Sequence, residues 1–284
     1  MIKNLLDLSG KIDELIIAGF EAITDVATSL DIPFFVVGAT ARDMILGFGY
    51  NIDISRATVD IDLGVRISDW DQYKKMKEVL IATGDFIRAK AEQRLLYKGR
   101  LPIDILPFGP IVDGNDDIAW PPEHDVKMSL LGFEEAYHYS QLVRLRSNPN
   151  LDVLFATPVG LAVMKIVAWN ERYPEGNKDG ADLAFVMRNY MDAGNQERLV
   201  DEHADLTDDD DFDYVLAGAR LLGRDVAEML RPATKTEILS ILNRETGEQD
   251  RYRLVEDMMS GSTSENFEEV LELLETFKKG MQDA

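Results

Sequence analysis

The segment 58–65 alternates apolar and acidic side chains, which is the pattern of a strand with one buried face. Successive side chains of a strand point to opposite faces, so Asp60 and Asp62 share the face away from their apolar neighbours. Their α-carbons would lie about 6.6 Å apart, and two carboxylates that close are costly unless a cation or a proton lies between them. A strand with a solvated polar face gives the same pattern by chance, so the motif needs support from elsewhere in the chain.

Residues 101–106 offer a third carboxylate, because Asp104 lies between two isoleucines and faces away from them. If the two strands are neighbours, Asp60, Asp62 and Asp104 form a metal site. Carboxylate oxygens suit Mg²⁺, which is usually completed by substrate phosphates, and Mn²⁺ accepts the same ligands. The chain has no cysteine and only three scattered histidines, which argues against a zinc site.

A glycine turn joins a buried strand at 32–37 to a helix at 40–46. Gly38 permits close approach of the backbone to a phosphate, the helix start supplies free N–H donors, and Arg42 adds a positive charge. The segment lacks both the Walker ending and the dinucleotide-binding fingerprint. By itself it is more typical of a tight structural turn.

The order of the expected elements predicts an α+β fold, with a short mixed β-sheet flanked by helices and a C-terminal helical domain. Residues 147–150 are the best boundary, which gives a first domain at 1–148 that carries the candidate metal site and a helical domain at 149–284. After the boundary we expect only helices, the first beginning at Thr157-Pro158. The end of the helical domain is strongly acidic.

The net charge of −22 excludes a general nucleic-acid coat and generic DNA binding, and it disfavours an anionic membrane surface. Residues 191–284 alone carry a net charge of −14, with 24 acidic and 10 basic residues. Neither a signal peptide nor a membrane span is expected, so a cytoplasmic protein is the default. One basic cluster could approach RNA locally; it comprises Arg88, Lys90, Arg94, Lys98 and Arg100.

Two later segments, KIVAWNER at 165–172 and KDGADL at 178–183, complete a recognisable succession. Together with Gly38 and the three aspartates, they resemble the nucleotidyltransferase superfamily with the DNA polymerase β-like fold. Within that superfamily the chain is similar to the AbiEii family, the toxin class of abortive-infection and type IV toxin–antitoxin systems. The resemblance covers about residues 33–190, and Ala39 stands where the family usually has a second glycine.

The resemblance implies a metal-dependent enzyme that transfers NMP from an NTP. Asp60 and Asp62 would hold Mg²⁺ or Mn²⁺, while Asp104 would hold a second ion or accept the acceptor's proton. Gly38, Thr40 and Arg42 would cradle the triphosphate. Lys165 would neutralise the charge on the pyrophosphate, and Arg172 lies on the same helix face. Asp182 would orient one of these two cations. The spacing alone also fits a solvated stripe beside a core Trp169.

The acceptor implied by the resemblance is an RNA such as tRNA, or a protein, and an antitoxin partner is expected if the chain is a toxin. Two other functions stay open. A catalytically inactive nucleotidyltransferase fold would bind nucleotide or a protein partner without turnover, and a small-molecule nucleotidyltransferase of the antibiotic-modifying type would use a hydroxylated acceptor. A helical adaptor with a chance D-x-D pattern would bind no metal nucleotide at all.

Overall fold

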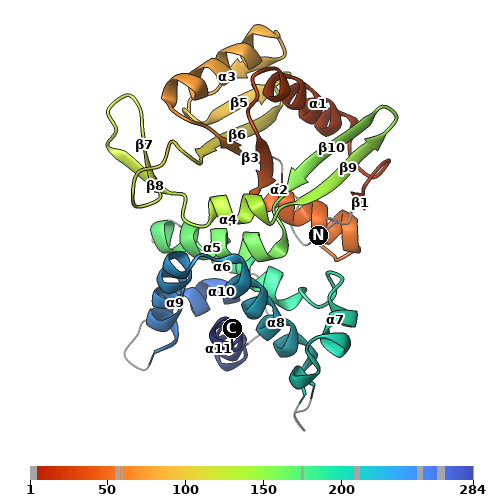
Figure 1. Cartoon of the computed structure of the whole chain (residues 1–284), viewed down its shortest axis with the longest axis vertical. Coiled ribbons are helices and arrows are strands. Elements are labelled where there is room, and N and C mark those ends of the chain that lie inside the picture. The colour runs from red at the N-terminus through yellow and green to blue at the C-terminus, as the bar shows by residue number, and fades with distance from the viewer. Residues whose placement is uncertain are drawn as a thin grey trace. The chain divides into compact units, whose positions relative to one another are not determined.

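The computed structural model describes residues 5–54, 58, 60–173, 176–207, 212–247, 252–260 and 266–283. The chain forms two compact units, Met1–Thr157 and Pro158–Ala284. The elements of both units can be followed in Figure 1.

The first unit is built on a mixed eight-stranded sheet with the order β1-β9-β10-β2-β3-β6-β5-β4. Parallel pairs are β1 with β9, β10 with β2, and β3 with β6; the other neighbours are antiparallel. A separate hairpin joins β7 to β8. The strands are β1 (Leu6–Asp7), β2 (Phe34–Val37), β3 (Ile61–Arg66), β4 (Phe86–Arg88), β5 (Arg94–Tyr97), β6 (Leu101–Phe108), β7 (Asp117–Trp120), β8 (Val126–Ser129), β9 (Gln141–Ser147) and β10 (Asn150–Phe155).

Alternation along β3 and β6 separates a helix-covered face from a polar one. Ile61, Leu63 and Ile105 are almost fully buried. The helices α1 (Glu14–Ser29) and α3 (Trp70–Ala82) pack together on this face (Figure 1), and the Tyr73 hydroxyl of α3 donates to the carbonyl of Ile105 at 3.0 Å. The acidic side chains of the two strands therefore lie on the other face of the sheet.

Part of that other face is covered by aromatic packing from α4 (Phe133–His138). The ring of Phe35 lies 5.6 Å from Tyr137 and 5.4 Å from Phe108, between ring centroids. Gly64 is needed beneath it, because a Cβ there would lie 2.4 Å from the Phe35 ring. The aromatic cluster covers the sheet toward the end of β3, whereas Asp62 and its partner Asp104 lie near the beginning of β3.

The sheet extends beyond the boundary expected from the sequence. Strand β10 follows that boundary, although only helices were predicted there. It forms a hairpin with β9 and buries Leu151, Val153 and Phe155 on one side, the alternation of a half-buried strand. The hairpin of β7 and β8 and the three-residue β4 are further strands not expected from the sequence.

The second unit is helical. It contains α5 (Pro158–Arg172), α6 (Lys178–Arg188), α7 (Gln196–Asp201), a short 3₁₀ turn at Ala204–Leu206, α8 (Tyr214–Met229), α9 (Pro232–Thr246), α10 (Arg253–Met259) and α11 (Phe267–Asp283). Within the described ranges, none of the helices in the chain is both long and apolar enough to cross a membrane.

Helices α8 and α11 pack with their backbones in contact. A Cβ built on Gly223 of α8 would lie 2.1 Å from the carbonyl oxygen of Phe277, and one built on Gly280 of α11 would lie 2.0 Å from the carbonyl oxygen of Arg220. At the same crossing, Asp283 accepts hydrogen bonds from Arg220 at 2.8 and 3.1 Å. Glycine on both helices thus permits an approach that other side chains would block.

We expect Gly280→Ala to lower the free energy of unfolding by about 2–3 kcal/mol, because the added methyl group forces the backbones of α8 and α11 apart. Alanine is the better helix former by about 1 kcal/mol, so the packing cost outweighs a favourable change in propensity. Urea denaturation followed by circular dichroism measures the difference. Gly176→Ala is the control, since nothing lies within 4 Å of a Cβ there; equal stability of the two variants would contradict the close crossing.

Candidate active site

Three neighbouring strands place Asp62, Asp104 and Arg94 in one row. Asp62 of β3 pairs in register with Asp104 of β6, and Asp104 pairs in register with Arg94 of β5. Directly paired residues on neighbouring strands point to the same face of a sheet. Strand register alone therefore brings two carboxylates and one guanidinium together on the polar face.

Asp60 completes the carboxylate cluster from a bend just before β3. One carboxylate oxygen from each of Asp60, Asp62 and Asp104 lies within 4.8 Å of the others. The side chain of Asp60 is 38% exposed and that of Asp104 is 13% exposed, so the cluster opens to solvent at one side. The three aspartates expected to meet from the sequence do come together.

Arg94 is bound to this cluster. Its Nε and Nη2 donate to the two oxygens of Asp104, each at 2.7 Å, and Nη2 also donates to Asp60 at 3.1 Å. Hydrogen bonds to Asp104 raise the pKa of the guanidinium above its ordinary range, with the charges of the three aspartates adding to the effect. The sequence placed Arg94 in a basic surface for RNA; the structure instead places it against the carboxylates.

The glycine turn at the start of α2 (Gly38–Arg42) touches the acidic strand directly. Gly38 has a φ of 66°, and a Cβ there would lie 2.1 Å from Oδ2 of Asp62. The hydroxyl of Thr40 donates to the backbone carbonyl of Asp60. Turn and carboxylates are thus one local unit, in which only glycine fits at position 38.

The helix after the turn carries a buried ion pair. Arg42 donates from Nε to Asp43 at 2.8 Å, and both side chains are buried. Asp43 begins a π-helical segment, Asp43–Gly49, and accepts a hydrogen bond from the hydroxyl of Thr58 at 2.7 Å. The guanidinium of Arg42 therefore belongs to a network that ties the helix to the chain just before Asp60.

The remaining predicted residues lie in the second unit and form a network of their own. Lys165 of α5 contacts Asp182 at 2.5 Å and Asp179 at 3.0 Å, both on α6. Arg172 bonds to the other oxygen of Asp179 at 2.7 Å. Trp169 is fully buried and donates to Asp257 at 2.7 Å, so the helix face between the two cations is core.

The Lys165 side chain is only 14% exposed, so its charge depends on its partners. Burial by itself would lower the pKa of Lys165, but the charges of Asp182 and Asp179 outweigh it and the pKa is raised. Both carboxylates are similarly buried, at 13% and 12% exposure. The result is a cation held in a fixed position by two anions on one helix face.

The model of the family described as "Nucleotidyl transferase AbiEii toxin, Type IV TA system" matches residues 22–273. The chain belongs to the AbiEii family. It is therefore a nucleotidyltransferase enzyme, with a mixed sheet and C-terminal helices as expected from the sequence. Comparison with curated proteins gave no match.

Several solved structures resemble this AbiEii-family chain. The antibiotic-resistance factor ANT(2'')-Ia is 12% identical, with a TM-score of 0.38 over 69% of this chain and 93% of that chain. A CCA-adding enzyme in apo form II is 15% identical, with a TM-score of 0.32 over 91% of this chain and 67% of that chain. The Thermotoga maritima CCA-adding enzyme complexed with tRNA is 16% identical, with a TM-score of 0.27 over 93% and 67% of the two chains.

In this AbiEii-family nucleotidyltransferase, the sequence analysis did not assign Arg94 to the carboxylate cluster or Asp179 to the network around Lys165. Counting back from the turn at 98–100 pairs Arg94 with Asp104 across the hairpin, so the sequence did contain the signal for Arg94. Asp179 lies three residues before Asp182 on α6 and shares its helix face. Only Asp182 was singled out from the sequence, although Asp179 bridges Lys165 and Arg172.

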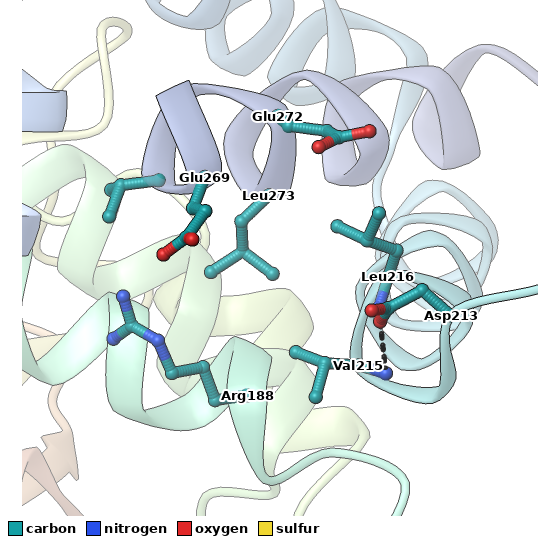
Figure 2. Close-up of a pocket in the computed structure, with 8 residues that line it drawn as sticks. Arg188, Asp213, Val215, Leu216, Glu269, Glu272 and Leu273 are labelled. Atoms are coloured by element: carbon teal, nitrogen blue, oxygen red, sulfur yellow. Dashed lines mark hydrogen bonds between the residues drawn. The ribbon is translucent and has the colours of Figure 1, made fainter. Parts of the chain in front are cut away.

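A shallow groove lies among α6, α8 and α11 (Figure 2). Leu216, Leu273 and Val215 line it together with Glu269, and Asp213 at its edge caps α8 through backbone N–H groups. It is partly apolar and partly acidic. Its lining contains none of the residues expected to bind metal or nucleotide.

We expect Lys165→Met to lower the free energy of unfolding by about 3–5 kcal/mol, because it leaves two buried carboxylates without their shared cation. Arg172→Met is the control; Arg172 pairs with the same Asp179 but is 57% exposed, so its loss should cost under about 1 kcal/mol. Urea denaturation of both variants measures these costs.

The pH dependence of that difference follows from the raised pKa of Lys165. A raised folded-state pKa gives stability that is complete below the unfolded pKa, about 10, and is lost as pH rises through the folded value. The difference in unfolding free energy between wild type and Lys165→Met should therefore be the same at pH 7 and pH 9. A difference that vanishes by pH 9 would contradict the charged pair.

Proposed function

We propose that this protein is a Mg²⁺- or Mn²⁺-dependent enzyme that transfers NMP from an NTP to RNA, with tRNA the first acceptor to test, and that it acts as a toxin. The observation that carries the proposal is the cluster of Asp60, Asp62 and Asp104 beside the Gly38 turn. Membership of the AbiEii family supports the reaction, and the description of that family supports the toxin role.

The donor set of the cluster fits a hard divalent cation. All three groups are carboxylates, their oxygens are close enough for shared ligation, and the cluster is open to solvent at Asp60. Asp60 and Asp62 would hold the ion, with Asp104 as the third carboxylate. A divalent cation bound there would stabilise negative charge on the triphosphate during attack at the α-phosphorus.

The chain's own groups would hold the nucleotide and move the proton. Gly38 lets the backbone approach the phosphates, and Thr40 fixes the turn to Asp60. The acceptor hydroxyl oxygen forms a bond to the α-phosphorus as the bond to pyrophosphate breaks. The hydroxyl proton passes to a carboxylate of the cluster, for which Asp104 is the candidate, or to water.

Arg42 and Lys165 are proposed to contribute in different ways. Arg42 is paired with Asp43, so it would act mainly by stiffening the helix that follows the phosphate turn. Lys165, held by Asp182 and Asp179, is proposed to neutralise charge on the leaving pyrophosphate, with Arg172 as its neighbour. The role of Lys165 rests on the family resemblance of its motif.

An RNA acceptor needs a positive approach on this acidic protein, and the β4–β5–β6 region offers one. Four cations there are exposed, namely Arg88, Lys90, Lys98 and Arg100. They lie on the hairpin strands and turns that also carry Arg94 toward the carboxylates. An antitoxin is the proposed protein partner, because the matching family model names a type IV toxin–antitoxin system.

Asp62→Ala should abolish nucleotidyl transfer, with a loss of at least about 100-fold, because it removes a central carboxylate of the cluster. The assay offers each α-labelled NTP with Mg²⁺ or Mn²⁺ to total RNA, to tRNA and to the protein itself. Asp125→Ala, an exposed acidic residue outside the cluster, is the control and should keep full activity. Unchanged transfer by a folded Asp62→Ala variant would overturn the metal assignment.

Reversing charge at the hairpin tests the acceptor separately from the chemistry. Lys98→Glu with Arg100→Glu should weaken tRNA binding several-fold and reduce its salt dependence, since fewer phosphates are neutralised. Arg94 is left intact, so the carboxylate cluster is undisturbed. The matched control is Lys74→Glu with Lys75→Glu on the exposed side of α3. Equal loss of tRNA binding in both double variants would argue against a specific RNA surface.

A further inference from the structure

Arg94 is held against the carboxylates by the sheet itself. It lies on β5, between β4 and β6, and its position opposite Asp104 is set by strand register. The two 2.7 Å bonds to Asp104 use different nitrogens and different oxygens, which is the paired geometry that makes arginine–carboxylate contacts strong. The third bond, to Asp60, extends the contact to a second member of the cluster.

These bonds engage the same oxygens that metal binding and proton transfer need. Both oxygens of Asp104 accept from Arg94, as does Oδ2 of Asp60. A guanidinium is always charged at ordinary pH, so it repels a divalent cation that approaches these oxygens. The negative charge of Asp62 also acts on the guanidinium of Arg94.

We propose that Arg94 competes with the divalent cation for Asp104 and Asp60, and so sets the metal affinity of the site. The inference rests on the proposed function, because it takes the three aspartates as the metal ligands. Arg94 offsets the repulsion among the carboxylates when only protein groups are present. The ion must weaken or displace the contacts of Arg94 before Asp104 can bind it.

The surroundings of Arg94 allow such an exchange. Its side chain is 34% exposed and Asp60 is 38% exposed, so water can replace the lost hydrogen bonds as the guanidinium moves outward. Asp104 is 13% exposed and stays fixed on the central strand β6. The guanidinium of Arg94 is therefore the mobile partner of this pair, and the carboxylate of Asp104 is the fixed one.

Equilibrium dialysis with Mn²⁺ alone, without nucleotide, tests the competition on the full chain. Arg94→Gln removes the charge and keeps a polar side chain, and it should bind Mn²⁺ roughly tenfold more tightly than wild type. Arg94→Lys keeps the charge and should stay much closer to wild type. Arg100→Gln makes the same change in net charge at an exposed position of the same hairpin and should have little effect.

The outcomes separate this inference from the proposed function. If Asp62→Ala lowers Mn²⁺ binding but Arg94→Gln behaves like Arg100→Gln, the metal site stands and the competition is wrong. If Arg94→Gln weakens Mn²⁺ binding while remaining folded, Arg94 supports the site and the competition is also wrong. If neither wild type nor Arg94→Gln binds more Mn²⁺ than Asp62→Ala, both proposals fail.

Thermal unfolding gives a second measurement in case Arg94→Gln is less stable. A ligand that binds the folded state raises the midpoint of unfolding, and at a given concentration it raises the midpoint more the more tightly it binds. Mn²⁺ should therefore raise the midpoint of Arg94→Gln more than that of wild type at the same concentration. An equal or smaller rise would overturn the competition whatever the starting stability of the variant.

Discussion

Repulsion among three carboxylates is the constraint around which the first unit is built. The register of β3 and β6 brings Asp62 and Asp104 side by side, and the bend before β3 adds Asp60. Like charges this close are tolerated only with compensating charge. Arg94 supplies that charge from the next strand, while the Gly38 turn and the Thr40 hydroxyl hold the acidic segment from the other side.

The two units use cations in contrasting ways. Lys165 is 14% exposed between two buried carboxylates, so its removal leaves the charges of Asp179 and Asp182 without their shared cation in a place that water reaches poorly. Arg94 is 34% exposed and lies at the open side of its cluster, where water can take over its bonds. The first arrangement favours a permanent contact and the second an exchangeable one. Only the second suits the proposed metal site, which would have to accept a different cation.

The carboxylate cluster could be predicted because it depends on simple alternation. Asp60, Asp62 and Asp104 each stand between apolar neighbours. Two adjacent strands bring Asp62 and Asp104 together, and Asp60 lies in the bend just before the first of them. The full set of strands was harder to predict, since β4 has three residues and the separate hairpin of β7 and β8 lies in a segment rich in proline, glycine and aspartate. The place of Arg94 required hairpin register, and the pairing of Lys165 with Asp179 required the packing of α5 on α6.

The close crossing of α8 and α11 has a consequence for folding during synthesis. The apolar face of α8 buries Leu221, Leu222 and Val226, yet much of its cover comes from a helix far later in the chain. During synthesis α8 emerges from the ribosome before α11 does. The second unit can close its core only after the chain as far as Asp283 has emerged, so an arrested or truncated product would display bare apolar helix surface and invite chaperones or proteases.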